Sequence, residues 1–254
     1  MTRRLLELPL LSLGLVMVGL AVAITFAGAR LTRDRASSSS NEALGALHAT
    51  ISTIYTVLLA FVVVIVWQQF SDAEGHVETE ATRLSNILRD SRAFDEPARS
   101  NMHNAVLRYI DLASTGEWHA MAEGTGPDRP TTAAYEQIWE IAYRMQPTGV
   151  VQEAFYDEML VRLNELGAAR RTRLLSAQTS VPWALWALLV VGGALVLYIS
   201  FLLPTGSDAR GRRAALASTS CVIALTLFVI FVFDHPYSGG ISVEPTPLTD
   251  LLSR

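Results

Sequence analysis

The chain has 254 residues, half of them hydrophobic, with a net charge of −4 and a mean hydropathy of +0.30. Only 17% of the residues are charged, whereas a soluble domain usually carries about a quarter. The composition therefore argues against an ordinary soluble protein. The single cysteine, Cys221, excludes an intrachain disulfide and a cysteine-based metal site.

Four uncharged apolar stretches each reach the roughly 20 residues that a helix needs to cross a bilayer. They are residues 10–29, 44–69, 181–203 and 214–233. Trp67 ends the second stretch, and Trp183 and Trp186 begin the third, where interfacial rings are expected. We predict an all-α membrane protein with four transmembrane helices. The first stretch, which follows Arg3 and Arg4, also resembles a secretory signal peptide, and this alternative stays open.

The spans define a domain organisation with one large soluble insert. We predict a first transmembrane pair (1–70), an acidic helical insert (71–178), a second transmembrane pair (179–236) and a short tail (237–254). Between Asp72 and Arg173 the chain has 17 acidic residues and 11 arginines, a net charge of −6. Binding to nucleic acid needs a basic surface, so we expect no nucleic-acid partner.

The insert shows helical spacing of apolar residues and no alternating strand pattern. We predict helices with the apolar stripes Val77, Ala81, Leu84 and Leu88, then Met102, Val106, Tyr109 and Ile110, then Tyr135, Ile138, Trp139 and Ala142. Asp95 is expected to cap the second of them, with Pro97 in its first turn, and a threonine of "TTAAY" to cap the third. The segment "GTGPDRP" is expected to be a loop, and the residues after Pro147 to form one long helix.

An even number of spans places both termini and the insert on one side of the membrane. Arginines near the span ends divide equally, with six on each side, so the positive-inside rule does not decide the orientation. The N-terminal pair, Arg3 and Arg4, favours a cytoplasmic location for the termini and the insert.

The second span changes from hydroxyl-bearing to apolar along one row of side chains. In one interpretation, its hydroxyls satisfy backbone groups or bond neighbouring helices. In the other, several subunits bring this helix to a common axis, where hydroxyls line a vestibule and apolar residues form a constriction that gates by dewetting. The pore-lining candidates are His48, Ser52, Tyr55, Thr56, Val63, Trp67 and Phe70.

An acidic group follows this span and has two interpretations. It forms either a cation-attracting ring at a pore mouth or a solvated helix surface; its members are Asp72, Glu74, Glu78 and Glu80. The histidines lack metal-ligand spacing, and no nucleophile–base arrangement is present, so we expect no metal, no cofactor and no enzyme activity. The glycine pair Gly192–Gly193 is typical of a close helix crossing.

The order of these segments resembles the bacterial bestrophin-like domain family. The resemblance covers nearly the whole chain. It lies in "IYTVLLAFVVVIVWQQFSDAEGHVETEATRL", in "EW" at Glu117 and Trp118, in "RRTRL" at Arg170–Leu174, and in the tail motif of Asp234, Pro236, Tyr237 and Gly239. The family is named for bestrophins, pentameric chloride channels with a pore lined by the second span. The acidic cluster that binds calcium in animal bestrophins has no counterpart in the tail of this chain.

The resemblance implies a homo-oligomeric, multi-pass protein of a bacterial inner membrane that contacts lipid and inorganic ions. Our first hypothesis is an anion channel; a cation channel is the alternative that the acidic group favours. A non-conducting scaffold or sensor, with a protein partner on the helical insert, is the other alternative. The tail motif either caps the fourth helix and turns the chain back to the insert or contributes to a pore mouth, and Asp234 could pair with Arg170 or Arg173.

Overall fold

The computed structural model describes residues 19, 23, 41–203 and 209–253, and this part of the chain forms helices and no strand. Its elements are α3 (Asn41–Asp90), η1 (Ser91–Ala93), α4 (Ala98–Leu112), η2 (Ala113–Glu117), α5 (Trp118–Glu123), α6 (Arg129–Arg144), α7 (Val150–Ser176), α8 (Trp183–Leu202), α9 (Ala209–Phe233) and α10 (Thr246–Thr249). The all-α prediction is confirmed for these residues. The described helices α3, α8 and α9 are long and apolar enough to cross a membrane. The first predicted span and its signal-peptide alternative lie, apart from residues 19 and 23, outside the described residues.

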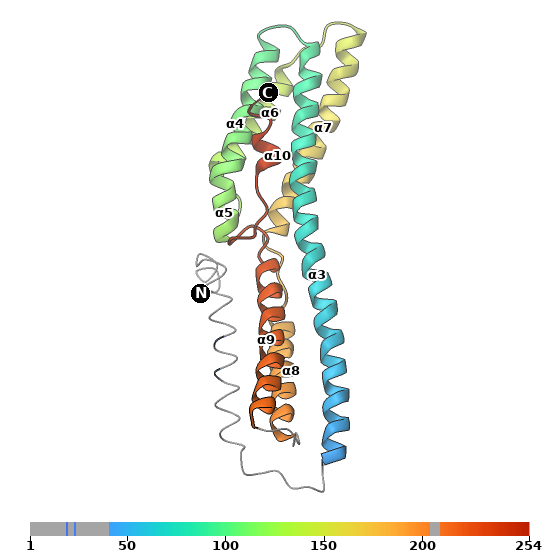
Figure 1. The fold of residues 1–254 in the computed structure, drawn as a ribbon. Helices are drawn as coiled ribbons and strands as arrows, with labels where there is room; N and C mark the ends of the chain where they lie inside the picture. The colour runs from blue at the N-terminus through green and yellow to red at the C-terminus, as the bar shows by residue number, and fades with distance from the viewer. Residues whose placement is uncertain (1–18, 20–22, 24–40, 204–208, 254) are drawn as a thin grey trace. The chain divides into compact units, whose positions relative to one another are not determined.

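The helix α3 joins the second predicted span and the first helix of the insert into one uninterrupted helix of 50 residues (Figure 1). The sequence pattern predicted these as separate segments. No proline interrupts the helix between residues 41 and 90, and Gly75 adopts ordinary helical backbone. The change from apolar to acidic composition along α3 therefore marks a change of environment without a break in the backbone.

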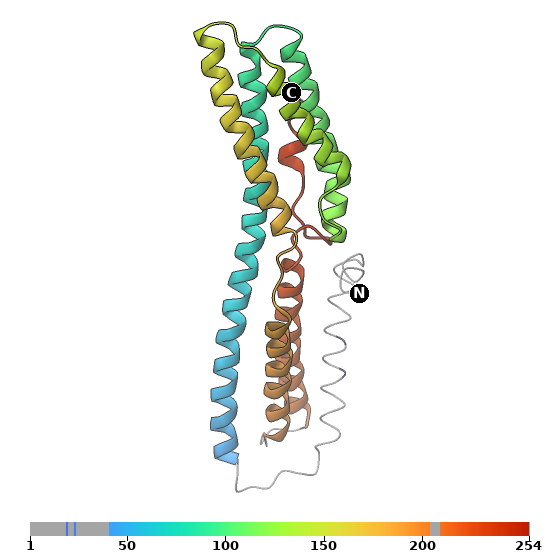
Figure 2. The same cartoon turned by 180° about the vertical axis from the view of Figure 1, so that it is seen from behind.

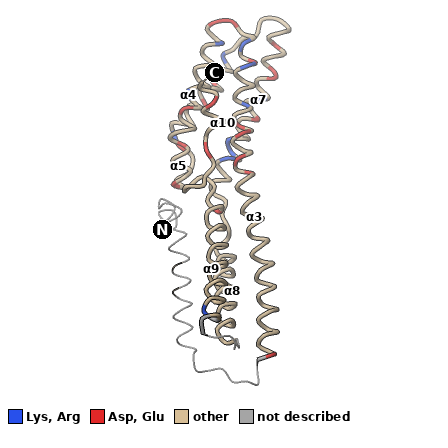
Figure 3. Tube along the Cα trace, viewed as in Figure 1, with Lys and Arg blue, Asp and Glu red and all other residues tan. Residues whose placement is uncertain are grey.

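The chain divides into two compact units. We call residues 1–68, 180–235 and 239–241 the membrane unit, and residues 69–179, 236–238 and 242–254 the bundle unit. Charged residues lie mainly on the helices of the bundle unit (Figure 3).

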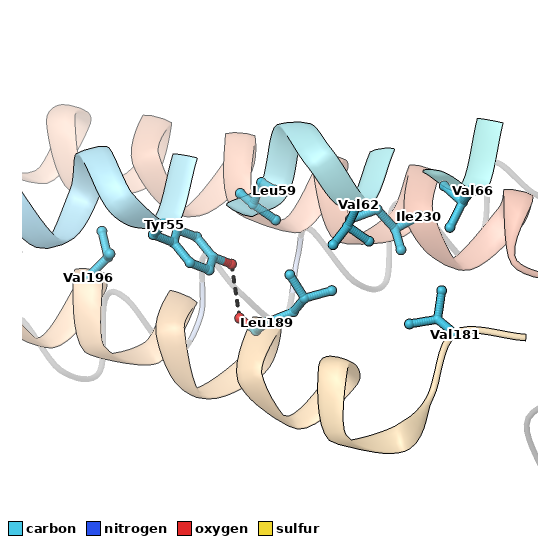
Figure 4. Close-up of a cluster of buried hydrophobic side chains, with 8 residues drawn as sticks. All are labelled: Tyr55, Leu59, Val62, Val66, Val181, Leu189, Val196 and Ile230. Atoms are coloured by element: carbon cyan, nitrogen blue, oxygen red, sulfur yellow. Dashed lines mark hydrogen bonds between the residues drawn. The ribbon is translucent and has the colours of Figure 1, made fainter. Parts of the chain in front are cut away.

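The described part of the membrane unit consists of the first half of α3 together with α8 and α9. The helices α8 and α9 lie side by side in both views (Figures 1 and 2). Side chains from all three helices and from Val181, two positions before α8, form a hydrophobic core, made of Tyr55, Leu59, Val62, Val66, Val181, Leu189, Val196 and Ile230 (Figure 4).

The bundle unit contains the second half of α3, the helices α4 to α7 and the tail helix α10. The predicted stripe of Met102, Val106, Tyr109 and Ile110 on α4 is confirmed, because all four side chains are buried. The helix predicted after Pro147 is also confirmed, since α7 runs unbroken for 27 residues. Residues 124–128 form the predicted loop.

Both predicted helix caps in the insert are wrong. Pro97 occupies the cap position of α4, and the carboxylate of Glu96, not that of Asp95, accepts a hydrogen bond from the backbone N–H of Ser100 at 3.2 Å. At α6, the cap is Asp128, whose carboxylate accepts the backbone N–H of Thr131 at 3.3 Å. Aspartate is a favoured capping residue, and Arg129 and Pro130 then fill the first helical turn.

Candidate pore helix and buried charge cluster

The membrane half of α3 turns one face toward α8 and α9. Tyr55, Leu59, Val62 and Val66 recur at intervals of three and four residues, so they share one side of the helix. All four are buried in the core of the membrane unit (Figure 4). This side of α3 packs within its own subunit.

Tyr55 lies between α3 and α8. Its hydroxyl donates a hydrogen bond to the carbonyl oxygen of Leu189, with 3.0 Å between the oxygens (Figure 4). A Cβ atom added to Gly192 would lie only 2.8 Å from Cδ2 of the Tyr55 ring, and one added to Gly193 would lie 2.8 Å from its hydroxyl. The glycine pair thus accommodates the Tyr55 ring, and this pore-lining candidate is buried inside the protomer.

His48 bonds across helices instead of standing alone. Its Nε2 lies 2.7 Å from the Oγ of Ser200 on α8 and 3.5 Å from the Oγ of Ser52. Ser200 also donates to the carbonyl oxygen of Val196 at 2.7 Å, so its hydroxyl bonds both α3 and its own helix. These contacts match the interpretation in which polar side chains hold membrane helices together.

The remaining pore-lining candidates differ in their exposure. Thr56 is exposed, and Val63 is partly buried against the core of the membrane unit. Trp67 is exposed and meets the ring of Phe233 edge to face, with centroids 5.4 Å apart. Phe70 is buried in the bundle unit. The candidates therefore do not form one continuous exposed row.

A different apolar set is exposed along α3. Ile54, Val57, Phe61 and Val64 follow one another at three or four residues, and Ile65 follows Phe61 by four, so the set forms one stripe on the side roughly opposite Tyr55. Its members are Ile54 (65% exposed), Val57 (50%), Phe61 (65%), Val64 (60%) and Ile65 (48%). We call these five residues the exposed α3 stripe.

The acidic group after the span divides into two kinds of residue. Asp72, Glu74 and Glu78 are exposed, as either interpretation requires. Glu80 has no exposed surface and lies in the interior of the bundle unit. Its assignment to a pore mouth is corrected, because its carboxylate pairs with a buried arginine.

That arginine, Arg173 on α7, is fully buried at the centre of a charge cluster. Its Nε donates to Oε2 of Glu80 at 2.5 Å, and its Nη2 donates to Oε2 of Glu117 at 2.7 Å. The third nitrogen, Nη1, contacts Sδ of Met121, and the guanidinium lies 5.6 Å from the centroid of the Trp118 ring. Every face of this cation therefore has a partner.

A second arginine and two hydroxyls complete the cluster. Arg170 donates to both oxygens of Glu117, at 2.5 and 3.3 Å, and to Oγ1 of Thr132 at 2.9 Å. The hydroxyl of Tyr109 donates to Oε1 of Glu80. Two carboxylates and two guanidinium groups thus neutralise one another, which buried charges require. We call Glu80, Glu117, Arg170 and Arg173 the charge cluster.

The buried charges raise the pKa values of Arg173 and Tyr109. Burial alone would lower the pKa of Arg173, but the carboxylates of Glu80 and Glu117 outweigh it and raise that pKa well above its ordinary value. Burial and the adjacent negative charge of Glu80 raise the pKa of Tyr109 well above its ordinary value. Arg173 therefore stays charged and Tyr109 neutral at physiological pH.

The cluster draws on α3, η2 and α7. Glu117 ends η2, a π-helical turn between α4 and α5, and such turns are frequent at functional sites. The sequence pattern did not predict that these charged residues pair with one another. A signal was present: Glu80 falls in the row of Ala73, Val77, Leu84 and Ile87, and Arg173 continues the row of Met159, Leu163 and Leu166, all of which are buried. A charge at a stripe position predicts a buried partner.

The tail motif has a structural role in each unit. In the membrane unit, the carboxylate of Asp234 accepts the backbone N–H of Val181 at 2.5 Å and the indole N–H of Trp186 at 3.2 Å. In the bundle unit, the hydroxyl of Tyr237 lies 3.0 Å from Ser176 Oγ, and its ring meets Trp118 edge to face. Pro236 is buried, and Gly239 has a φ of 94°, which favours glycine.

The suggested pairing of Asp234 with Arg170 or Arg173 is wrong. Both arginines bond the carboxylates of the charge cluster, and Asp234 instead accepts the two donors at the start of α8. Backbone N–H groups at a helix start lack partners within their own helix, and the carboxylate of Asp234 provides a hydrogen-bond acceptor there.

The model of the bestrophin-like domain matches residues 15–248, which is nearly the whole chain. The chain belongs to the bestrophin-like family. Among solved structures, it is similar to a point variant of a bacterial bestrophin homologue from Klebsiella pneumoniae, with 16% identity, a TM-score of 0.73, and coverage of 94% of this chain and 99% of that one. A second variant of that homologue gives 13% identity, a TM-score of 0.71, and coverage of 95% and 99%. A variant described only as a membrane protein has 16% identity and a TM-score of 0.72, with coverage of 93% of this chain and 96% of that one. None of the curated proteins compared with the chain matches it.

In this bestrophin-like chain, two of the stretches that carry the family resemblance, "EW" and "RRTRL", meet in the bundle unit. "EW" supplies Glu117 to the charge cluster and Trp118 to both Arg173 and Tyr237. "RRTRL" supplies Arg170 and Arg173. These motifs therefore assemble the bundle around α3.

Proposed function

We propose that this bestrophin-like protein is an oligomeric membrane ion channel in which α3 lines the conduction path. Membership of the family supports a membrane ion channel. A single subunit with so few spans has little room to enclose a passage, so the proposal requires several copies around an axis, five by resemblance to bestrophins.

The observation that carries the proposal is the exposed α3 stripe. α8 and α9 cover the side of the helix that holds Tyr55, and the stripe of Ile54 to Ile65 lies roughly opposite it. Apolar side chains that converge on an axis would form a constriction that water leaves readily, a recognised way to gate ion flow. Thr56, Val63 and Trp67 lie beside the stripe and remain candidates for its edge. We do not include Tyr55 or Phe70, because both are buried within their own subunit.

We propose anions as the conducted ions, following the family. The exposed carboxylates of Asp72, Glu74 and Glu78 come directly after the span and favour the alternative of a cation channel. In the proposed arrangement, the protein lies in a bacterial inner membrane with the bundle unit on the cytoplasmic side. Labelling of a cysteine placed at exposed Arg144, from one face of sealed vesicles, tests this orientation.

The test is ion flux from purified protein in liposomes, with the reversal potential recorded in a planar bilayer under a salt gradient. We expect Phe61→Ala, within the exposed α3 stripe, to raise chloride flux several-fold because it widens and wets the constriction. Val191→Ala, at an equally exposed position on α8, is the matched control and should leave flux unchanged. Flux that is indifferent to Phe61→Ala, or equally sensitive to both changes, would contradict the proposed lining.

The reversal potential decides between the alternatives. A value near the chloride equilibrium potential supports anion conduction, and a value near that of the cation shifts attention to Asp72, Glu74 and Glu78. Val63→Ala and Trp67→Ala test the positions beside the exposed α3 stripe: an increase in flux for these variants without one for Phe61→Ala would return the lining to the row predicted from the sequence. Absence of flux in several lipids favours the non-conducting scaffold or sensor.

A further inference from the structure

A cavity of about 560 Å³ lies in the bundle unit, apart from the charge cluster. The end of α3, the turn η1 and the start of α4 form its walls, and one residue of the tail completes them. The lining residues are Ser85, Leu88, Arg89, Ser91, Arg92, Glu96, Arg99, Ser100, His103 and Leu251. Cavities that hold small molecules usually measure about 300–1,000 Å³, so this one is of suitable size.

The lining is basic, although the insert as a whole is acidic. Three arginines face one carboxylate, which gives the lining a formal charge of +2. Glu96 is already engaged: it accepts from Arg99 Nε at 2.9 Å, from Arg99 Nη2 at 2.7 Å and from the backbone N–H of Ser100 at 3.2 Å. The charge of Glu96 therefore offsets that of Arg99, so the net positive charge of the lining comes from Arg89 and Arg92.

Arg89 and Arg92 retain most of their donor capacity. Arg89 is 64% exposed, and its Nε lies 3.5 Å from Asp90 Oδ1, which offsets part of its charge. Arg92 makes no ion pair or side-chain hydrogen bond with any residue that the structure describes. The hydroxyls of Ser91 and Ser100 donate to backbone carbonyls, whereas the side chains of Ser85 and His103 make no hydrogen bond within the described part of the chain.

We propose that this cavity binds a small anion that carries a phosphate group. Guanidinium groups present paired N–H donors that match phosphate oxygens, and a phosphate accepts from two of them at once. Leu88 and Leu251 supply an apolar wall beside these donors. The space exceeds that of a bare phosphate and suits a small phosphomonoester or a diphosphate. Because Leu251 belongs to the tail, the occupied cavity would also hold the tail on the bundle unit.

The test is isothermal titration of the full-length protein in detergent with inorganic pyrophosphate, in a buffer that contains no other phosphate. The double variant Arg89→Gln/Arg92→Gln should bind at least about tenfold more weakly, because hydrogen bonds to a charged group are lost. Arg108→Gln, which removes an exposed arginine of α4 outside the cavity, is the matched control and should bind as the unmodified chain does. Circular dichroism confirms that each variant is folded.

A parallel titration uses a short-chain, water-soluble phosphatidic acid, which carries the same phosphate on a lipid. Binding of pyrophosphate that depends on Arg89 and Arg92 supports a soluble ligand, and binding of the phosphatidic acid alone with that dependence supports a lipid headgroup. Absence of both, or binding that the double variant retains, overturns the proposal. The titration requires no flux, so its failure is distinguishable from failure of the channel proposal.

Discussion

The membrane unit exposes large apolar side chains along its helices, whereas the bundle unit buries a cluster of charged side chains. In the membrane unit, large apolar side chains are exposed, such as Phe61 on α3 and Trp183 at the start of α8, which is 82% exposed. In the bundle unit, Glu80, Glu117 and Arg173 have no exposed surface. A membrane helix meets lipid or another subunit, so its outside need not be polar. A helix in water hides its apolar stripe, and a charge on that stripe must find a partner inside.

One continuous helix, α3, belongs to both units. Its first half is held by steric packing, because the Tyr55 ring fits against Gly192 and Gly193. Its second half is held by charge, through Glu80 and Arg173. We expect substitutions in the two halves to differ in size, because a broken buried ion pair leaves an unpaired charge whereas a crowded contact can relax.

The largest effect is expected from the charge cluster. Arg173→Met leaves Glu80 without its buried cation and should lower the free energy of unfolding by about 3–5 kcal/mol, as for other broken buried pairs. Thermal and denaturant unfolding of the full-length protein in detergent measure this. Arg171→Met, at the exposed neighbouring position, is the matched control and should change stability by less than about 0.5 kcal/mol.

A double variant sharpens that test. In Arg173→Met/Glu80→Gln the charge of Glu80 is removed with that of Arg173, and the amide oxygen can still accept from Tyr109. Glu117 keeps its pair with Arg170. The double variant should therefore recover part of the lost stability. If the double variant is less stable than Arg173→Met alone, the cluster is not held by compensation of charge.

The sequence predicted the elements of the fold more completely than the site. Apolar spacing located three described helices that are long and apolar enough to cross a membrane, and the buried stripe of α4, because burial of a stripe is a local property of a helix. It did not predict the pairing of Glu80 with Arg173, because the two lie 93 positions apart and only the packed bundle brings them together. Nor did it predict which part of the molecule the row from His48 to Phe70 faces. In an apolar span, the hydrophobic pattern does not distinguish one side of the helix from another.

A smaller effect is expected at the glycine pair in the membrane unit. Gly192→Ala places a Cβ 2.8 Å from the Tyr55 ring and should destabilise the protein by about 1–3 kcal/mol through overpacking. The matched control is Gly75→Ala in α3, where nothing lies within 4 Å. That change should stabilise by roughly 0.5–1 kcal/mol, since alanine favours a helix. Equal thermal shifts for the two variants would show that the Tyr55 contact does not constrain α8.

The smallest effect at neutral pH is expected at Tyr237, and alkaline pH enlarges it. Tyr237→Phe removes the hydroxyl near Ser176 and Ala73 and should cost about 1 kcal/mol at pH 7. Burial raises the pKa of Tyr237 above its ordinary value of about 10, so the folded protein keeps a proton that the unfolded chain releases above that pH.

The sign of the pH dependence follows from that proton. Above pH 10 the folded state binds more protons than the unfolded state, so stability falls as pH rises, by up to about 1.4 kcal/mol per pH unit for each such tyrosine. Tyr109 in the bundle unit contributes in the same direction. Unfolding measured between pH 8 and 11 should therefore show a shallower decline for Tyr237→Phe than for the unmodified chain. Identical slopes would mean that Tyr237 titrates alike in both states and that its burial against Trp118 does not oppose ionisation.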